Sequence, residues 1–187
     1  TNNFANPYKV AVTINEGQQM MSVEGKAIDE LMVGKVVDTK AIMICDQLNG
    51  WDLQNDGFTA SNGNVISYGY YAPAADGHRN PLIVWNHGAG ETGTEILMDL
   101  LCNEVTALSG KEFQSIMNGC YVLVPQRRSG TSTQAVQELI EKTVNENPDI
   151  DPNRVLVAGC SAGGAQTVNL VKAYPDYYAA AVPICPA

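Results

Sequence analysis

Short apolar runs bounded by turn residues recur through the second part of the chain. Such runs predict buried strands, and they occupy residues 65–73, 81–86, 120–125, 154–159 and 178–185. Apolar residues at helical spacing lie between them and predict helices over residues 95–108, 131–148 and 162–173. Strands that alternate with helices predict an α/β fold, with a largely parallel sheet covered on both faces.

The two C-terminal helices are each predicted to bury one face. In the stretch 131–148 the apolar face of the helix comprises Ala135, Val136, Leu139, Ile140 and Val144, and Pro148 lies beyond the end of the helix. In the helix over 162–173 the i, i+3 spacing picks out Ala165, Val168 and Val171.

The first part of the chain has a less regular pattern. Residues 9–14 and 40–45 read as strands, whereas residues 46–57 are rich in turn residues. We therefore expect a β-rich segment over residues 1–59, either a small module or the leading antiparallel strands of the main sheet. Residues 60–187 would then form the α/β part. Because its last strand lacks a covering helix and a neighbour, we expect this domain to continue past Ala187.

Composition and charge limit the classes of partner that the protein can bind. The 187 residues carry a net charge of −9, which disfavours nucleic acid or an anionic membrane as the main partner. No apolar run approaches the roughly 20 residues of a spanning helix. The five cysteines match neither zinc spacing nor a dense disulfide framework. Buried free thiols are predicted, since Cys120, Cys160 and Cys185 lie in or beside apolar runs, and one bridged pair, such as Cys102 with Cys120, is the alternative. No metal or cofactor is implied.

A G-x-S-x-G sequence runs from Gly159 to Gly163, between a predicted strand and a predicted helix. This context is typical of a nucleophile elbow, in which the central serine is exposed on a strained turn. Gly159 and Gly163 flank Ser161 because the strand and the helix come very close there. The alternatives are a chance match in a tight turn and Cys160 as a thiolate nucleophile. Cys160 is instead expected to pack inward.

A second glycine-rich loop follows the apolar strand at residues 81–86, with the sequence His87-Gly88-Ala89-Gly90-Glu91. Acyl transfer needs backbone N–H donors aimed at a developing oxyanion, and such a loop supplies one in hydrolases with an elbow. Gly88 and Ala89 are the candidates here, together with Ala162 after the serine. A phosphate-binding loop is the alternative, but neither G-K-[ST] nor G-x-G-x-x-G is present. His87 and Gly90 are assigned to holding the loop open.

With both motifs in this order, the sequence resembles the α/β-hydrolase superfamily. More narrowly, it is similar to bacterial esterases related to polyhydroxybutyrate depolymerases and feruloyl esterases, some of which carry an immunoglobulin-like N-terminal module. The resemblance rests on residues 80–93, 119–126 and 149–186. It implies a three-layer α/β-hydrolase sandwich, of which residues 60–187 would be the N-terminal portion of the catalytic domain.

The resemblance also implies a triad in the order Ser, Asp or Glu, His. Ser161 is its nucleophile, but the chain has no histidine after it, and both histidines, His78 and His87, lie upstream. We therefore expect the catalytic histidine and acid to lie outside residues 1–187.

These observations favour a serine esterase that acts through an acyl-enzyme on short-chain or plant-polysaccharide acyl esters, such as acetyl or feruloyl groups. The alternatives are a serine peptidase of the prolyl-oligopeptidase type and a hydrolase fold that only binds. The acidic charge fits a secreted bacterial enzyme, and a cytoplasmic location stays open.

Overall fold

The computed structural model of the chain describes residues 9–13, 40–44 and 46–186. Its contacts divide the chain into two compact units, one within Pro7–Asp46 and a larger one that includes Gln47–Ala187. In the smaller unit β1 (Lys9–Thr13) and β2 (Lys40–Ile44) pair antiparallel. Both strands were predicted from the sequence and are confirmed.

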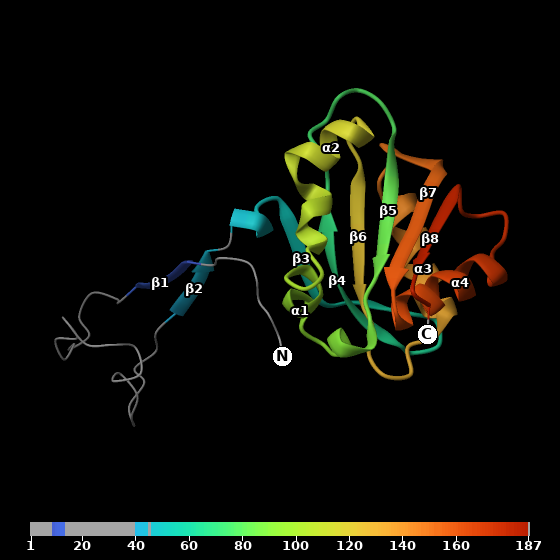
Figure 1. Ribbon diagram of the computed structural model, residues 1–187, viewed down its shortest axis with the longest axis horizontal. Coiled ribbons are helices and arrows are strands. Elements are labelled where there is room, and N and C mark those ends of the chain that lie inside the picture. The colour runs from blue at the N-terminus through green and yellow to red at the C-terminus, as the bar shows by residue number, and fades with distance from the viewer. Residues whose placement is uncertain (1–8, 14–39, 45, 187) are drawn as a thin grey trace. The chain divides into compact units, whose positions relative to one another are not determined.

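A six-stranded mixed sheet forms the centre of the larger unit (Figure 1). Its order is β3-β4-β6-β5-β7-β8. The last four in this order run parallel, whereas β3 and β4 form an antiparallel edge. The strands span Trp51–Thr59 (β3), Val65–Tyr71 (β4), Asn80–Asn86 (β5), Tyr121–Gln126 (β6), Ile150–Cys160 (β7) and Ala180–Ile184 (β8).

Helices cover the two faces of this sheet and make the fold three-layered. Figure 1 shows α1 (Ile96–Leu100) and α2 (Lys111–Met117) over one face, with α3 (Thr133–Glu146) and α4 (Ala162–Ala173) over the other. Two apolar clusters correspond to the two faces. Leu82, Val84 and Leu123 belong to the cluster with α3 and α4, while Ile83 and Val122 belong to the cluster with α1. Alternate strand residues thus enter opposite cores, which explains why β5 and β6 read as continuous apolar runs.

The helix predicted over residues 95–108 is wrong in its extent. α1 ends at Leu100, and a separate 3₁₀ helix covers Val105–Ser109. Between them Asn103 and Glu104 take left-handed conformations, with φ of 51° and 53°. Two consecutive left-handed residues end a right-handed helix and redirect the chain, so that Val105 is buried by a new turn. The helix α2 was not predicted.

The turn-rich reading of residues 46–57 is also wrong, because β3 occupies most of this stretch. β3 is an edge strand in which only Trp51 is fully buried, so polar residues are tolerated along it. Its pairing with β4 is irregular between Gln54 and Phe58, where Asp56 has a φ of 51°. The predicted boundary at residues 59 and 60 lies between β3 and β4, which pair with each other, whereas the contacts divide the chain between Asp46 and Gln47.

The two C-terminal helices lie where the sequence placed them, but one buries a different face. In α3 the predicted apolar residues pack into the core, and the Ser132 hydroxyl accepts a bond of 3.1 Å from the Ala135 N–H as N-cap. In α4 the predicted residues Ala165, Val168 and Val171 are only half-buried. The buried positions are instead Gly163, Gly164, Gln166, Thr167 and Leu170. Hydropathy misses this face because glycine adds almost nothing to an apolar period.

Candidate functional site

Ser161 occupies a sharp turn at the carboxyl end of β7, directly before α4. Its φ of 53° and ψ of −121° lie in a region that non-glycine residues rarely adopt, so its backbone is strained. The Ser161 N–H donates a 2.9 Å bond to the Ile184 carbonyl of β8, which anchors the turn to the neighbouring strand. The side chain is exposed at the sheet edge where open α/β folds bind ligands.

The glycines on either side of Ser161 sit in contacts that no side chain would fit. A Cβ on Gly159 would lie 2.6 Å from the Asn86 carbonyl oxygen and from that of Gly163. A Cβ on Gly163 would lie 2.0 Å from the Asn86 oxygen and 2.5 Å from the His87 oxygen. The strand β5, the strand β7 and the first turn of α4 therefore meet backbone against backbone, and this contact fixes the position of Ser161.

The loop after β5 passes beside this turn. His87 and Gly88 are buried, and a short 3₁₀ helix then covers Ala89–Glu91. A Cβ built on Gly88 would lie 3.7 Å from the Ser161 Cβ and 3.6 Å from the Cys160 carbonyl oxygen. The structure thus brings together the two glycine-rich motifs that the sequence separated by some seventy residues. Ala162 begins α4 and shares its amino end with Ser161.

Cys160 lies half-buried beside these groups as a free thiol. Burial raises its pKa, the Glu91 carboxylate raises it further, and the Gly88 backbone amide lowers it. A raised pKa disfavours the thiolate, which is the nucleophilic form.

Cys102 and Cys120 are also free, so a bridge between these two is wrong. Cys120 is buried as predicted, whereas Cys185 is free but exposed, so its predicted burial is wrong. Cys45 lies outside the described residues.

His87 is buried with both ring nitrogens engaged. Nε2 accepts a 2.8 Å bond from the Arg127 N–H, and Nδ1 lies 2.6 Å from the Gly88 carbonyl oxygen. Because a backbone N–H can only donate, Nε2 must be unprotonated, and the proton belongs on Nδ1. Burial, reinforced by Arg127, lowers the His87 pKa to about 4. The ring is therefore a neutral brace of the loop and has no nitrogen free to serve Ser161.

A group of buried polar side chains lies next to the loop, and one of them, Asp99, belongs to α1. Asp99 is 1% exposed, and its Oδ1 lies 3.9 Å from His87 Nδ1. In the part of the chain that the structure describes, neither Asp99 oxygen has a hydrogen-bond partner. Desolvation, with Glu91 adding to it, raises the Asp99 pKa to about 9. Arg127 completes the group, since its Nη2 donates a 2.6 Å bond to the His87 carbonyl.

Three residues of this site were missed from the sequence: Glu91, Asp99 and Arg127. Asp99 carried a usable signal, because it is a carboxylate one turn after Ile96 on an otherwise apolar helical face. Glu91 lies within the loop motif but was given no role. Arg127 comes from the end of β6, and only the parallel pairing of β5 with β6 brings it to His87.

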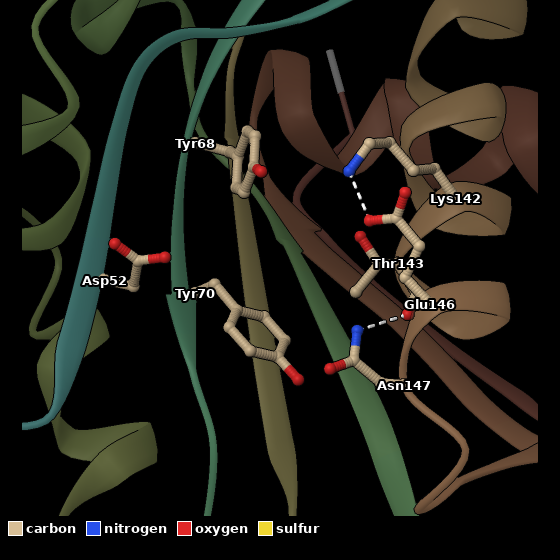
Figure 2. Close-up of a pocket in the computed structure, with 7 residues that line it drawn as sticks. All are labelled: Asp52, Tyr68, Tyr70, Lys142, Thr143, Glu146 and Asn147. Atoms are coloured by element: carbon tan, nitrogen blue, oxygen red, sulfur yellow. Dashed lines mark hydrogen bonds and ion pairs between the residues drawn. The ribbon is translucent and has the colours of Figure 1, made fainter.

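A separate hollow lies between the β3–β4 edge and the carboxyl end of α3. Figure 2 shows Tyr68 and Tyr70 of β4 facing α3, with Asp52 of β3 beside them. Its helix side is lined by polar groups that satisfy one another: Lys142 pairs with Glu146, and the Asn147 amide bonds the Thr143 carbonyl. Ser161 does not line it, so this hollow is not part of the candidate site.

No family model matches the chain. Poly(3-hydroxyalkanoate) depolymerase C of Paucimonas lemoignei is 25% identical over 150 residues, which cover 70% of this chain and 33% of that protein. A solved thermostable esterase superposes with a TM-score of 0.65 at 24% identity, over 79% of this chain and 45% of that one.

Two further structures extend the comparison. The acetyl xylan esterase of Aspergillus awamori has a TM-score of 0.52 at 19% identity, over 70% of this chain and 50% of that one. An acylaminoacyl peptidase has a TM-score of 0.53 at 18% identity, over 78% and 26%. The fold is therefore that of the α/β hydrolases, as predicted, and the chain resembles esterases of this type. It spans from about a quarter to a half of the lengths of these relatives. No helix in the described part of the chain is long and apolar enough to cross a membrane.

Proposed function

We propose that this protein is a serine hydrolase of carboxylic esters that works through an acyl-enzyme on Ser161. The observation that carries the proposal is the strained Ser161 turn with Gly88 packed beside it. Strain at an exposed serine is costly to the fold and is typical of functional positions. The similarity to a depolymerase and to esterases supports ester chemistry at this turn.

In this proposal Ser161 Oγ attacks the ester carbonyl, and the negative charge that develops on its oxygen is met by backbone N–H groups. One is that of Ala162, at the amino end of α4, where the helix dipole adds positive potential. The other comes from the loop after β5. Gly88 and Ala89, where the 3₁₀ turn begins, are the two candidate donors. The tetrahedral intermediate then collapses, the bond to the alcohol oxygen breaks, and the alcohol leaves with the proton that the catalytic base took from Ser161, so that the acyl group stays on Ser161. Water attacks this acyl-enzyme, and the carboxylic acid and free Ser161 are released.

The base and the acid of the triad are proposed to come from outside residues 1–187. His87 has both nitrogens engaged. His78 is exposed in the loop before β5. Because β5 and β7 run parallel and Ser161 follows the end of β7, His78 lies at the opposite edge of the sheet. Neither histidine is therefore placed to take the Ser161 proton.

Two other functions remain as alternatives. A serine peptidase shares the same turn and loop, and an acylaminoacyl peptidase is among the structural neighbours. A module that binds without catalysis would need neither a histidine nor an acid. Short-chain or polysaccharide-linked acyl esters are our proposed substrates, and secretion our proposed location, in line with the acidic charge.

The full-length protein and its Ser161→Ala variant test this proposal on p-nitrophenyl acetate. We expect the variant to lose at least about a thousandfold in kcat/KM, since loss of a nucleophile removes the covalent route. A fluorophosphonate probe should label the wild type and not the variant. Ser129→Ala, in an exposed loop, is the matched control and should keep both properties. Equal hydrolysis and labelling by wild type and Ser161→Ala would exclude Ser161 as the nucleophile.

A further inference from the structure

We infer that Glu91 selects substrates by charge: it disfavours anionic esters and favours cationic ones at Ser161. This inference rests on the proposed function, because it assigns a substrate class to the same site. It starts from an unusual feature of the loop, in which an acidic side chain folds back over the segment expected to hold the oxyanion.

The position of the Glu91 carboxylate follows from its contacts around Gly88. The point where a Gly88 Cβ would lie is 3.1 Å from Glu91 Oε2 and 3.7 Å from the Ser161 Cβ. The carboxylate oxygen and the serine Cβ are therefore no farther apart than these two distances together. Glu91 Oε2 thus shares the immediate surroundings of Ser161, and part of the side chain is reached by solvent.

The second carboxylate oxygen holds the side chain in this position. Asn103 Nδ2 donates a 3.1 Å bond to Glu91 Oε1, which leaves Oε2 turned toward Gly88. The Glu91 N–H is also bonded to the Gly88 carbonyl, at 3.4 Å, within the 3₁₀ turn. The backbone bond and the side-chain bond together fix the position of the Glu91 carboxylate within the loop.

No cation in the described part of the chain forms an ion pair with this carboxylate within 4.0 Å. The nearby Arg127 directs its Nη2 to the His87 carbonyl oxygen instead. Glu91 also raises the pKa of Cys160, Asp99 and Cys102 around it. Its negative field therefore extends to the residue next to Ser161, and an ester entering the site meets it.

A field of this kind acts with opposite sign on opposite charges. For a partly exposed carboxylate at several ångströms, Coulomb attraction or repulsion in a solvated site corresponds to about three- to tenfold in an equilibrium or rate constant. A cationic and an anionic ester should thus differ by about ten- to a hundredfold beyond their intrinsic reactivities. A loop that served only as a mechanical support would affect both esters alike.

The test compares wild type with Glu91→Gln in the full-length protein on three aryl acetates that differ at the para position. This position carries hydrogen in phenyl acetate, an anionic carboxylate in 4-acetoxybenzoate and a cationic trimethylammonium group in 4-(trimethylammonio)phenyl acetate. Glutamine retains an oxygen to accept the Asn103 bond but has no charge. The ratio of kcat/KM for the cationic over the anionic ester should fall by about tenfold or more in Glu91→Gln. In wild type, 0.5 M NaCl should compress the same ratio.

Glu95→Gln is the matched control, because Glu95 is exposed just before α1 in the same loop, and its ratio should equal that of the wild type. A Glu91→Gln ratio unchanged from wild type overturns the inference, and so does an equal loss on all three esters. Wild-type cleavage of phenyl acetate that Ser161→Ala abolishes leaves the proposed function intact in both cases. Failure of the wild type on all three esters overturns the function together with this inference.

Discussion

Two glycine-rich segments meet at Ser161, and they use glycine for different reasons. In the turn after β7, a side chain on Gly159 or Gly163 would collide with backbone at 2.0–2.6 Å. In the loop after β5, a Cβ on Gly90 would find nothing within 4 Å. The first segment is held by close contact between backbones, whereas the second is held by the hydrogen bonds of His87, Arg127 and Gln126.

This difference shows that glycine content alone does not identify how a loop is fixed. Where backbone packs on backbone, the position is rigid because there is no space to move. Where buried polar groups hold the chain, its position depends on their protonation and pairing. The turn should therefore be sensitive to added volume, and the loop to pH.

The largest effect is expected for Gly163→Ala. The added methyl would lie 2.0 Å from the Asn86 carbonyl oxygen, so α4 or β5 must shift. We expect a loss of about 3 kcal/mol or more in the free energy of unfolding, measured by urea unfolding monitored by circular dichroism. Esterase activity should fall as well, because Ser161 moves with α4. A loss below about 1 kcal/mol in the free energy of unfolding would show that the backbone contact at Gly163 can relax at little energetic cost.

A pH-dependent effect, smaller than the Gly163→Ala loss for each pH unit, is expected for Asp99→Asn. Folded Asp99 keeps its proton up to a pKa of about 9, whereas the ordinary value is 3.8. The folded state thus binds more protons than the unfolded state in this window, and stability falls as pH rises, by at most about 1.4 kcal/mol per pH unit. His87 acts in the opposite sense between its folded pKa of about 4 and its ordinary 6.5. The net fall should therefore appear from about pH 6.5 to pH 9.

Urea unfolding of wild type and Asp99→Asn across this range measures the effect. The asparagine cannot ionise, so the variant should gain stability relative to wild type as pH rises. Asp176→Asn, in an exposed loop, serves as the control and should follow the wild type. Parallel curves for wild type and Asp99→Asn from pH 6.5 to 9 would mean that Asp99 does not titrate there.

The smallest effect is expected for Gly90→Ala. Gly90 has open space around it, and its φ is not in the left-handed region. The substitution should change the free energy of unfolding by no more than about 1 kcal/mol, with a slight gain from the lower entropy of the unfolded chain. Thermal unfolding of Gly90→Ala and Gly163→Ala, measured under the same conditions, compares the two segments directly. A loss as large as that of Gly163→Ala would remove the distinction between the two segments.

The sequence predicted secondary structure best where a regular apolar pattern and turn residues occur close together along the chain. Residues 154–173 predicted the strand, the turn and the helix around Ser161, and β7 and α4 confirm these elements. It failed at β3, where an edge strand tolerates Asn55 and Asp56, and at α1, where left-handed Asn103 and Glu104 interrupt an apolar period. Both failures come from positions where tertiary context outweighs local pattern.

Prediction of the candidate site from sequence was limited in the same way, because part of the site depends on tertiary contacts. The serine turn and the loop after β5 each have a local motif, so both were found from sequence. Asp99 and Arg127 reach His87 only because α1 packs over the sheet and β6 lies beside β5. No spacing along the chain encodes these contacts. The catalytic roles of Ser161, Ala162, Gly88 and Ala89 stay predictions that the Ser161→Ala experiment addresses first.

The bond between the Ser161 N–H and the Ile184 carbonyl has an evolutionary consequence. The Ile184 carbonyl oxygen accepts this bond, and a Cβ on Gly164 would lie 2.6 Å from the same oxygen. Both contacts involve a main-chain atom of β8, so they do not depend on which side chain stands at position 184. Descendants of this protein should thus keep glycine at position 164, whatever residue occupies position 184.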